Sequence, residues 1–114
     1  RDNNQKEFVS ISQLSKKVKD ALEEMQNDLF NKAKKFLESN IAEAKDWNEF
    51  VRHIKSKKLV KAFFCGNAEC ETSIKDKTDG VTSRTIPFEQ PKAIGSCVHC
   101  GKEGKYLVIF GKAY

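Results

Sequence analysis

The chain has 114 residues, of which 32% are charged and 39% hydrophobic, and its formal net charge is +5. This length predicts one domain, or a small module with an attached element, and excludes a multidomain enzyme. A compact piece of about half the chain buries too little apolar surface to be stable alone, so we expect a bound metal or disulfides to stabilise it.

The positive charge lies in the second half: residues 51–114 carry twelve basic and six acidic side chains, against nine and ten in residues 1–50. Both an anionic partner such as RNA and a solvated lysine-rich surface are compatible with this asymmetry.

The amino end predicts neither export nor a membrane span. Residues 1–7 are polar where a secretory signal has its hydrophobic stretch, and no run of eighteen apolar residues occurs. We therefore expect a cytoplasmic protein. Because the chain opens on Arg1 without an initiator methionine, we also expect a fragment of a longer protein.

An amphipathic helix is predicted over residues 10–45, with a possible break near Ser39. Ser10 is placed to cap it, and Gln13 follows three residues later as in a capping box. A helix of this length spans roughly 50 Å and can be a strut between domains, a coiled-coil seam, or a core helix packed on the rest of the chain. Its apolar residues recur in steps of three and four, which places them on one stripe: Ile11, Leu14, Val18, Leu22, Met25, Leu29, Ala33, Phe36, Leu37, Ile41 and Ala44.

A second, short helix is predicted to begin after Asp46, which can cap it, with Glu49 three residues later. The lysines that follow complement the helix dipole, and His53 is expected to be a packing residue. After this helix, strands are predicted at 59–64, at 81–88 with an interruption at Pro87, and at 106–110, and residues 75–80 read as a turn-rich loop.

The four cysteines carry the most specific signal. They form two close pairs, Cys65-x4-Cys70 and Cys97-x2-Cys100, separated by 26 residues. Two such pairs are typical of a tetrahedral structural zinc site, in which each pair sits on a sharp backbone turn. A glycine follows the first and the last cysteine, where such turns often need a positive φ. The pattern predicts that all four thiolates hold one structural Zn²⁺.

Two other uses of the cysteines compete with a metal site. Disulfides suit a secreted chain, and this one shows no sign of export. A redox role for Cys97-Val98-His99-Cys100 leaves Cys65 and Cys70 unexplained. His99 can in principle replace a cysteine as a ligand, but four thiolates already complete the shell, which makes it a bystander. A closed shell of four sulfurs has no open position for substrate, and no motif of a catalytic site accompanies it.

The predicted fold is α+β: a long amphipathic helix and a short helix lead into a small, zinc-ribbon-like antiparallel β module at residues 46–114. Four segments of this module, together with the order in which they occur, resemble the carboxyl-terminal domain of archaeal and eukaryotic-type prolyl-tRNA synthetases. They are Trp47-Asn48-Glu49-Phe50, Phe64-Cys65-Gly66 to Cys70-Glu71, Cys97-Val98-His99-Cys100-Gly101-Lys102, and Phe110-Gly111-Lys112-Ala113-Tyr114.

The resemblance implies a parent enzyme that ligates proline to tRNA(Pro) with ATP and Mg²⁺, through a class II catalytic domain absent from this chain. It also implies that the module packs against the catalytic domain, with Tyr114 near the active site. An anticodon-binding domain is expected to precede the long helix, with residues 1–9 as the tail of that domain. The parent is expected to be a homodimer. Two departures from the family are Ala113, where a serine is frequent, and a short loop at 71–84.

The leading hypothesis is therefore a zinc-stabilised docking module without activity of its own. The alternative is a free-standing zinc ribbon that binds nucleic acid. A ribbon of that kind exposes aromatic and basic residues together, whereas Phe63, Phe64 and Phe110 lie within apolar runs that predict burial.

Overall fold

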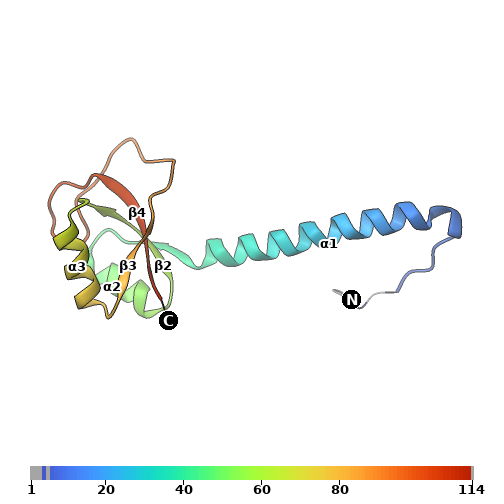
Figure 1. Cartoon of the computed structure of the whole chain (residues 1–114), viewed down its shortest axis with the longest axis horizontal. Coiled ribbons are helices and arrows are strands. Elements are labelled where there is room, and N and C mark those ends of the chain that lie inside the picture. The colour runs from blue at the N-terminus through green and yellow to red at the C-terminus, as the bar shows by residue number, and fades with distance from the viewer. Residues whose placement is uncertain (1–3, 5, 114) are drawn as a thin grey trace. The chain divides into compact units, whose positions relative to one another are not determined.

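The computed structural model describes residue 4 and residues 6–113, which form two compact units, residues 1–38 and 39–114. The first unit contains most of one long helix, and the second contains a four-stranded sheet with two short helices (Figure 1). Among the described residues, none of the helices is long and apolar enough to cross a membrane. In chain order the elements are α1 (Ile11–Ser39), β1 (Ile41–Glu43), α2 (Trp47–Lys55), β2 (Leu59–Phe64), α3 (Ala68–Lys77), β3 (Val81–Thr85) and β4 (Tyr106–Lys112).

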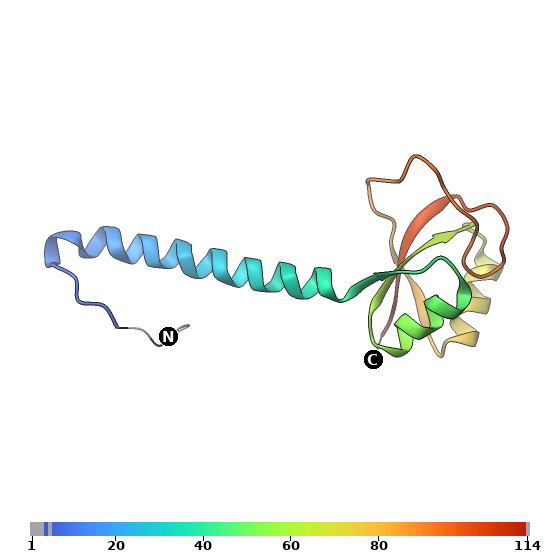
Figure 2. The same ribbon diagram turned by 180° about the vertical axis from the view of Figure 1, so that it is seen from behind.

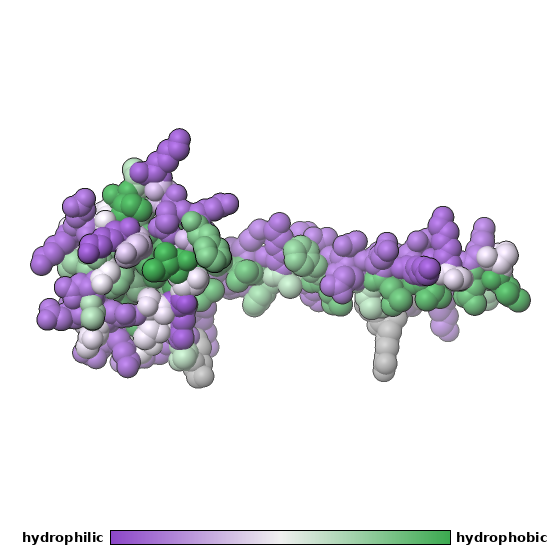
Figure 3. All heavy atoms as spheres, turned by 45° about the horizontal axis from the view of Figure 1, so that its top comes forward, coloured by the Kyte–Doolittle hydropathy of each residue, from purple (hydrophilic) through white to green (hydrophobic). Residues whose placement is uncertain are grey.

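Helix α1 confirms the predicted amphipathic helix and its start. Taken by itself it has no buried residue, and its apolar side chains line one edge of the helix in Figure 3. The hydroxyl of Ser10 pairs with Ser12 Oγ at 3.2 Å, and the backbone N–H of Gln13 donates to Ser10 O at 3.0 Å.

The predicted extent of this helix, to residue 45, was wrong. The helix ends at Ser39, and Ile41–Glu43 forms a short strand that pairs in parallel with β2, with Ile41 opposite Leu59. Ile41 and Ala44 keep the helical spacing in the sequence, but an edge of the sheet is available to them, and Ala44 is buried in the core. Pairing with a distant strand therefore overrides the local pattern.

The sheet has the strand order β1-β2-β4-β3 and is mixed, because β1 is parallel to β2 while β2, β4 and β3 pair antiparallel (Figure 1). Within residues 46–114 the strands pair antiparallel, as predicted for the module. The parallel edge strand β1 comes from residues 41–43, which were predicted to be helical. Strands β2 and β4 confirm the predictions at 59–64 and 106–110. Strand β3 ends at Thr85, before Pro87, which lacks the N–H needed to continue the ladder.

Helix α2 follows its predicted cap: Asp46 Oδ1 accepts from the backbone N–H of Glu49 at 2.9 Å. Helix α3 replaces part of the predicted turn-rich loop, since it extends from Ala68 to Lys77. Its apolar pattern is too sparse for an amphipathic prediction, yet Asn67 caps it by accepting from the N–H of Glu69 at 2.9 Å. The prediction of a loop over 75–80 is therefore wrong for residues 75–77, and the loop expected at 71–84 is reduced to residues 78–80 between α3 and β3.

The hydrophobic core lies where α2 and α3 meet the sheet, and Figure 2 shows the same arrangement from behind. Phe110 of β4 is fully buried at its centre and makes edge-on ring contacts with Phe50 of α2 at 5.3 Å and Phe64 of β2 at 5.6 Å. Burial of Phe64 and Phe110 agrees with the expectation from their apolar runs, whereas Phe63 is only half-buried. Cys70 and Cys97 belong to the same buried cluster, so the cysteines adjoin the core.

Candidate metal centre

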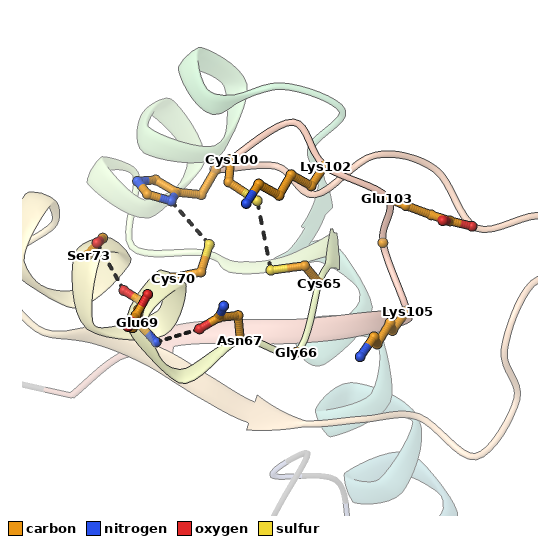
Figure 4. A pocket seen from close by; sticks show the side chains of 12 residues that line it. Cys65, Gly66, Asn67, Glu69, Cys70, Ser73, Cys100, Lys102, Glu103 and Lys105 are labelled. Carbon is orange, nitrogen blue, oxygen red and sulfur yellow. Dashed lines mark hydrogen bonds between the residues drawn. The ribbon is translucent and has the colours of Figure 1, made fainter.

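The structure brings Cys65, Cys70, Cys97 and Cys100 together, and their four sulfur atoms all lie within 4.8 Å of one another. Cys65 follows the end of β2, and Cys70 lies in the first turn of α3. The other two lie on the loop before β4. All four are free thiols. Figure 4 shows Cys65 and Cys100 reaching toward each other from separate segments, with Cys70 beside them.

The spacing of the sulfur atoms suits a tetrahedral site. The Cys70–Cys97 and Cys65–Cys100 sulfurs are each 3.8 Å apart. Four sulfurs at about 2.3 Å from one central ion are separated by about 3.8 Å along the edges of the tetrahedron. A disulfide needs about 2.05 Å between sulfurs. The cysteine group therefore has the size of a cage for one metal ion, and its donor set is one that Zn²⁺ prefers.

Two glycines allow the turns that aim the sulfurs. Gly66 and Gly101 have φ values of +76° and +69°, a region that favours glycine, as the sequence predicted. After Gly66 the chain enters α3 through its Asn67 cap, which places Cys70 in the first turn of the helix. The sequence did not predict this helical support for Cys70; the signal was an asparagine followed by acidic residues at 69 and 71 and by basic residues at 75 and 77.

The second cysteine pair is held by backbone hydrogen bonds. The N–H of Cys97 donates to Lys102 O at 2.7 Å, and the N–H of Gly101 donates back to Cys97 O at 3.0 Å. The loop is fastened to the sheet by Val98 N–H, which donates to Phe63 O at 2.9 Å. The sheet thus positions both pairs, because Phe63 lies only two residues before Cys65.

The four thiols differ in burial and in acidity. Cys70 and Cys97 are buried, whereas Cys100 is exposed. Burial raises the pKa of Cys65 and of Cys70. Burial acts in the same direction on Cys97, but backbone N–H groups of Cys100 and His99 outweigh it and lower the pKa of Cys97 to about 7. A thiol whose pKa is raised carries its proton at neutral pH, and a bound divalent cation would displace that proton.

His99 lies at the edge of the cysteine group and is not among its ligand atoms. Its Nδ1 is 3.1 Å from Cys70 Sγ, its Nε2 is 2.9 Å from Lys77 Nζ, and its ring meets Trp47 edge-on at 5.0 Å. Burial, and then the charge of Lys77, lower the pKa of the imidazole. The sequence-based view of His99 as a bystander missed these contacts, since nothing in the spacing relates it to Lys77.

An open hollow of about 740 Å³ lies beside the cysteines on the side of Cys65 and Cys100 (Figure 4). Its lining includes two cationic side chains, Lys102 and Lys105, and two acidic ones, Glu69 and Glu103. The hollow is part of the surroundings of the cysteine group. Tyr114, the other predicted site residue, lies outside the described residues.

Comparison with known proteins decides the family. Residues 47–114 match the family model described as prolyl-tRNA synthetase, C-terminal. The chain belongs to this family. It is 43% identical over its whole length to proline–tRNA ligase 2 of Bacillus cereus and 44% identical to proline–tRNA ligase of Agathobacter rectalis. In both comparisons the chain spans 24% of the relative.

A solved structure agrees with the family match. The crystal structure of prolyl-tRNA synthetase from Cryptosporidium parvum with L-proline and AMP superposes with a TM-score of 0.89 at 32% identity, over 96% of this chain and 24% of that one. The resemblance stated from the cysteine pairs and their flanks is therefore confirmed. The α+β fold class is confirmed as well, with the mixed sheet and the shorter α1 as its corrections.

Proposed function

We propose that this chain is the zinc-stabilised structural and docking domain of a proline–tRNA ligase. The family match and the names of the relatives support this assignment. The parent would ligate proline to tRNA(Pro) with ATP and Mg²⁺, as a homodimer in the cytoplasm, and the catalytic and anticodon-binding domains of the same chain would be the partners of this module. The isolated chain would be inactive.

Zn²⁺ is the proposed ion, with Cys65, Cys70, Cys97 and Cys100 as its ligands. The observation that supports it is the pair of 3.8 Å sulfur separations, which suit a tetrahedral four-thiolate shell. Such a shell leaves no position for water or substrate, so the ion would stabilise the fold and take no part in the chemistry. It would tie the end of β2, the first turn of α3 and the loop before β4 to one point.

A docking role is supported by the compactness of the module. Residues 39–114 form one compact unit with a hydrophobic core of its own. Tyr114 would extend beyond β4 and support the active site of the parent, which is the role that the family resemblance implies. A strand held by the sheet and by the cysteine loop loses little freedom when its end meets a neighbouring domain.

The test compares the parent enzyme with a version that lacks the residues of this chain. Proline-dependent exchange of pyrophosphate into ATP should fall in the shortened enzyme and recover in part when the 114-residue chain is added separately. The chain alone should show no exchange. Full activity of the shortened enzyme would contradict the docking role. If the chain alone retarded both single-stranded RNA and tRNA in a gel-shift assay, the nucleic-acid-binding zinc ribbon would be favoured instead.

A further inference from the structure

The side chain of His99 joins three segments that are far apart in the sequence. It projects from between Cys97 and Cys100, and its Nδ1 reaches Cys70 Sγ of the other pair at 3.1 Å. On the opposite side of the ring, Nε2 lies 2.9 Å from Lys77 Nζ at the end of α3. Both ring nitrogens therefore have a partner.

The chemistry of Lys77 fixes the direction of both hydrogen bonds. An ammonium group has three donors and no acceptor, so Nε2 of His99 must accept from Lys77. A neutral imidazole whose Nε2 accepts carries its proton on Nδ1. The Nδ1–H group then donates to the sulfur of Cys70. The hydrogen bonds run in one direction, from Lys77 through His99 to Cys70.

We propose that His99 and Lys77 are positioning residues of the metal centre, which hold an N–H donor against the Cys70 thiolate and place a positive charge behind it. The inference rests on the zinc site proposed above. Metal-bound sulfur that is buried keeps little hydration, and Cys70 is only 8% exposed. A hydrogen-bond donor at that sulfur replaces part of the lost water.

Lys77 places a positive charge near a metal centre that would carry a net negative charge. Four thiolates and one Zn²⁺ leave two net negative charges in a partly buried site. The Lys77 ammonium has no lone pair and cannot be a ligand, but it polarises the imidazole and strengthens the bond to Cys70. The Nζ atom of Lys77 also lies over the ring of Trp47, 5.9 Å from its centroid.

Trp47 fixes the plane of the imidazole. The two rings meet at 68° with their centroids 5.0 Å apart, and Trp47 is itself stacked on the buried Phe50 at 5.4 Å. The orientation of His99 is thus set by α2 from one side and α3 from the other. The metal centre would in this way be linked to both helices as well as to the sheet.

The experiment uses the zinc-loaded 114-residue chain and four variants. His99→Phe keeps a ring against Trp47 but removes the donor; His99→Asn keeps an amide donor near the position of Nδ1; Lys77→Met keeps the stem and removes the charge. His53→Phe is the matched control, because His53 lies on α2 outside the cysteine group. Zinc affinity is measured by competition with a chromophoric chelator, and the His99 tautomer by long-range ¹H–¹⁵N correlation spectra.

We expect His99→Phe to weaken zinc binding about 10-fold or more, the effect typical of residues that orient metal ligands. His99→Asn should recover part of the loss, Lys77→Met should weaken binding less than His99→Phe, and His53→Phe should bind as the unmodified chain does. In the unmodified chain the spectra should show the proton of His99 on Nδ1, and Lys77→Met should shift the population toward Nε2.

Two results would overturn the inference while leaving the zinc site intact: a proton on Nε2 in the unmodified zinc-loaded chain, or unmodified zinc affinity in both His99→Phe and Lys77→Met. If His99→Phe fails to fold, the tautomer and the affinity of Lys77→Met decide the matter. An unmodified chain that binds no zinc would refute the zinc proposal itself, and this inference would fall with it.

Discussion

Replacement of Phe110 separates the contribution of the hydrophobic core to the free energy of unfolding from the contribution of the bound metal. Its side chain is fully buried and contacts the rings of Phe50 and Phe64. Truncation of a buried phenylalanine to alanine costs about 3–5 kcal/mol, and two edge-on aromatic contacts place Phe110→Ala toward the upper end of that range. A unit the size of residues 39–114 has a total stability of about 4–11 kcal/mol.

The loss is therefore a large share of what the polypeptide can supply by itself. We expect metal-free Phe110→Ala to be largely unfolded, and the zinc-bound variant to remain folded with a lower unfolding midpoint, because structural zinc adds about 10 kcal/mol in small zinc peptides. Unfolding in urea would be followed by circular dichroism and by the fluorescence of Trp47, with and without chelator.

Phe88→Ala is the matched control, since it makes the same chemical change at a fully exposed residue. Its free energy of unfolding should change by less than about 0.5 kcal/mol. Equal losses in the two variants would refute the burial argument. If metal-free Phe110→Ala were as stable as the metal-free unmodified 114-residue chain, the argument that the core alone provides little stability would be refuted.

Three further predictions concern the amino-terminal cap of α2, the loop between β3 and β4, and the carboxyl end of the chain. Asp46→Ala should lower the free energy of unfolding by about 1 kcal/mol, because it removes the cap that accepts from Glu49 N–H, whereas the same change at exposed Asp76 should be nearly silent in a urea titration. Gln90→Leu should speed hydrogen exchange at the amide of Leu107, which donates to Gln90 Oε1 at 2.7 Å; unchanged protection would mean that the loop is held by other contacts. Deletion of Tyr114 should leave zinc content and melting temperature of the chain unchanged and lower pyrophosphate exchange in the parent, and unaltered exchange would restrict Tyr114 to a passive role.

Local patterns in the sequence predicted the elements whose stabilising contacts are local or strongly periodic. The start of α1, the Asp46 cap of α2 and the apolar run of β2 each depend on neighbours within a few residues. The cysteine pairs were equally readable, because a four-thiolate site requires two turns with close pairs of ligands. The positive φ of Gly66 and Gly101 followed from the same requirement.

Structural features that depend on partners distant in the sequence could not be predicted from local sequence patterns. Ile41 continues the helical stripe in the sequence, and only its pairing with Leu59 makes it a strand residue. Helix α3 buries just Cys70 and Ile74, too few apolar positions to reveal a helix by periodicity. The contact of His99 with Lys77 joins residues 22 positions apart, and no local spacing predicts it.

The most direct test of the central claim is zinc K-edge X-ray absorption on the freshly purified 114-residue chain, combined with elemental analysis. The four sulfurs of Cys65, Cys70, Cys97 and Cys100 predict one zinc per chain in a shell of four sulfurs at about 2.3 Å. Less than half an equivalent of metal with unchanged thermal stability in chelator, or a shell that contains nitrogen or oxygen, would contradict it.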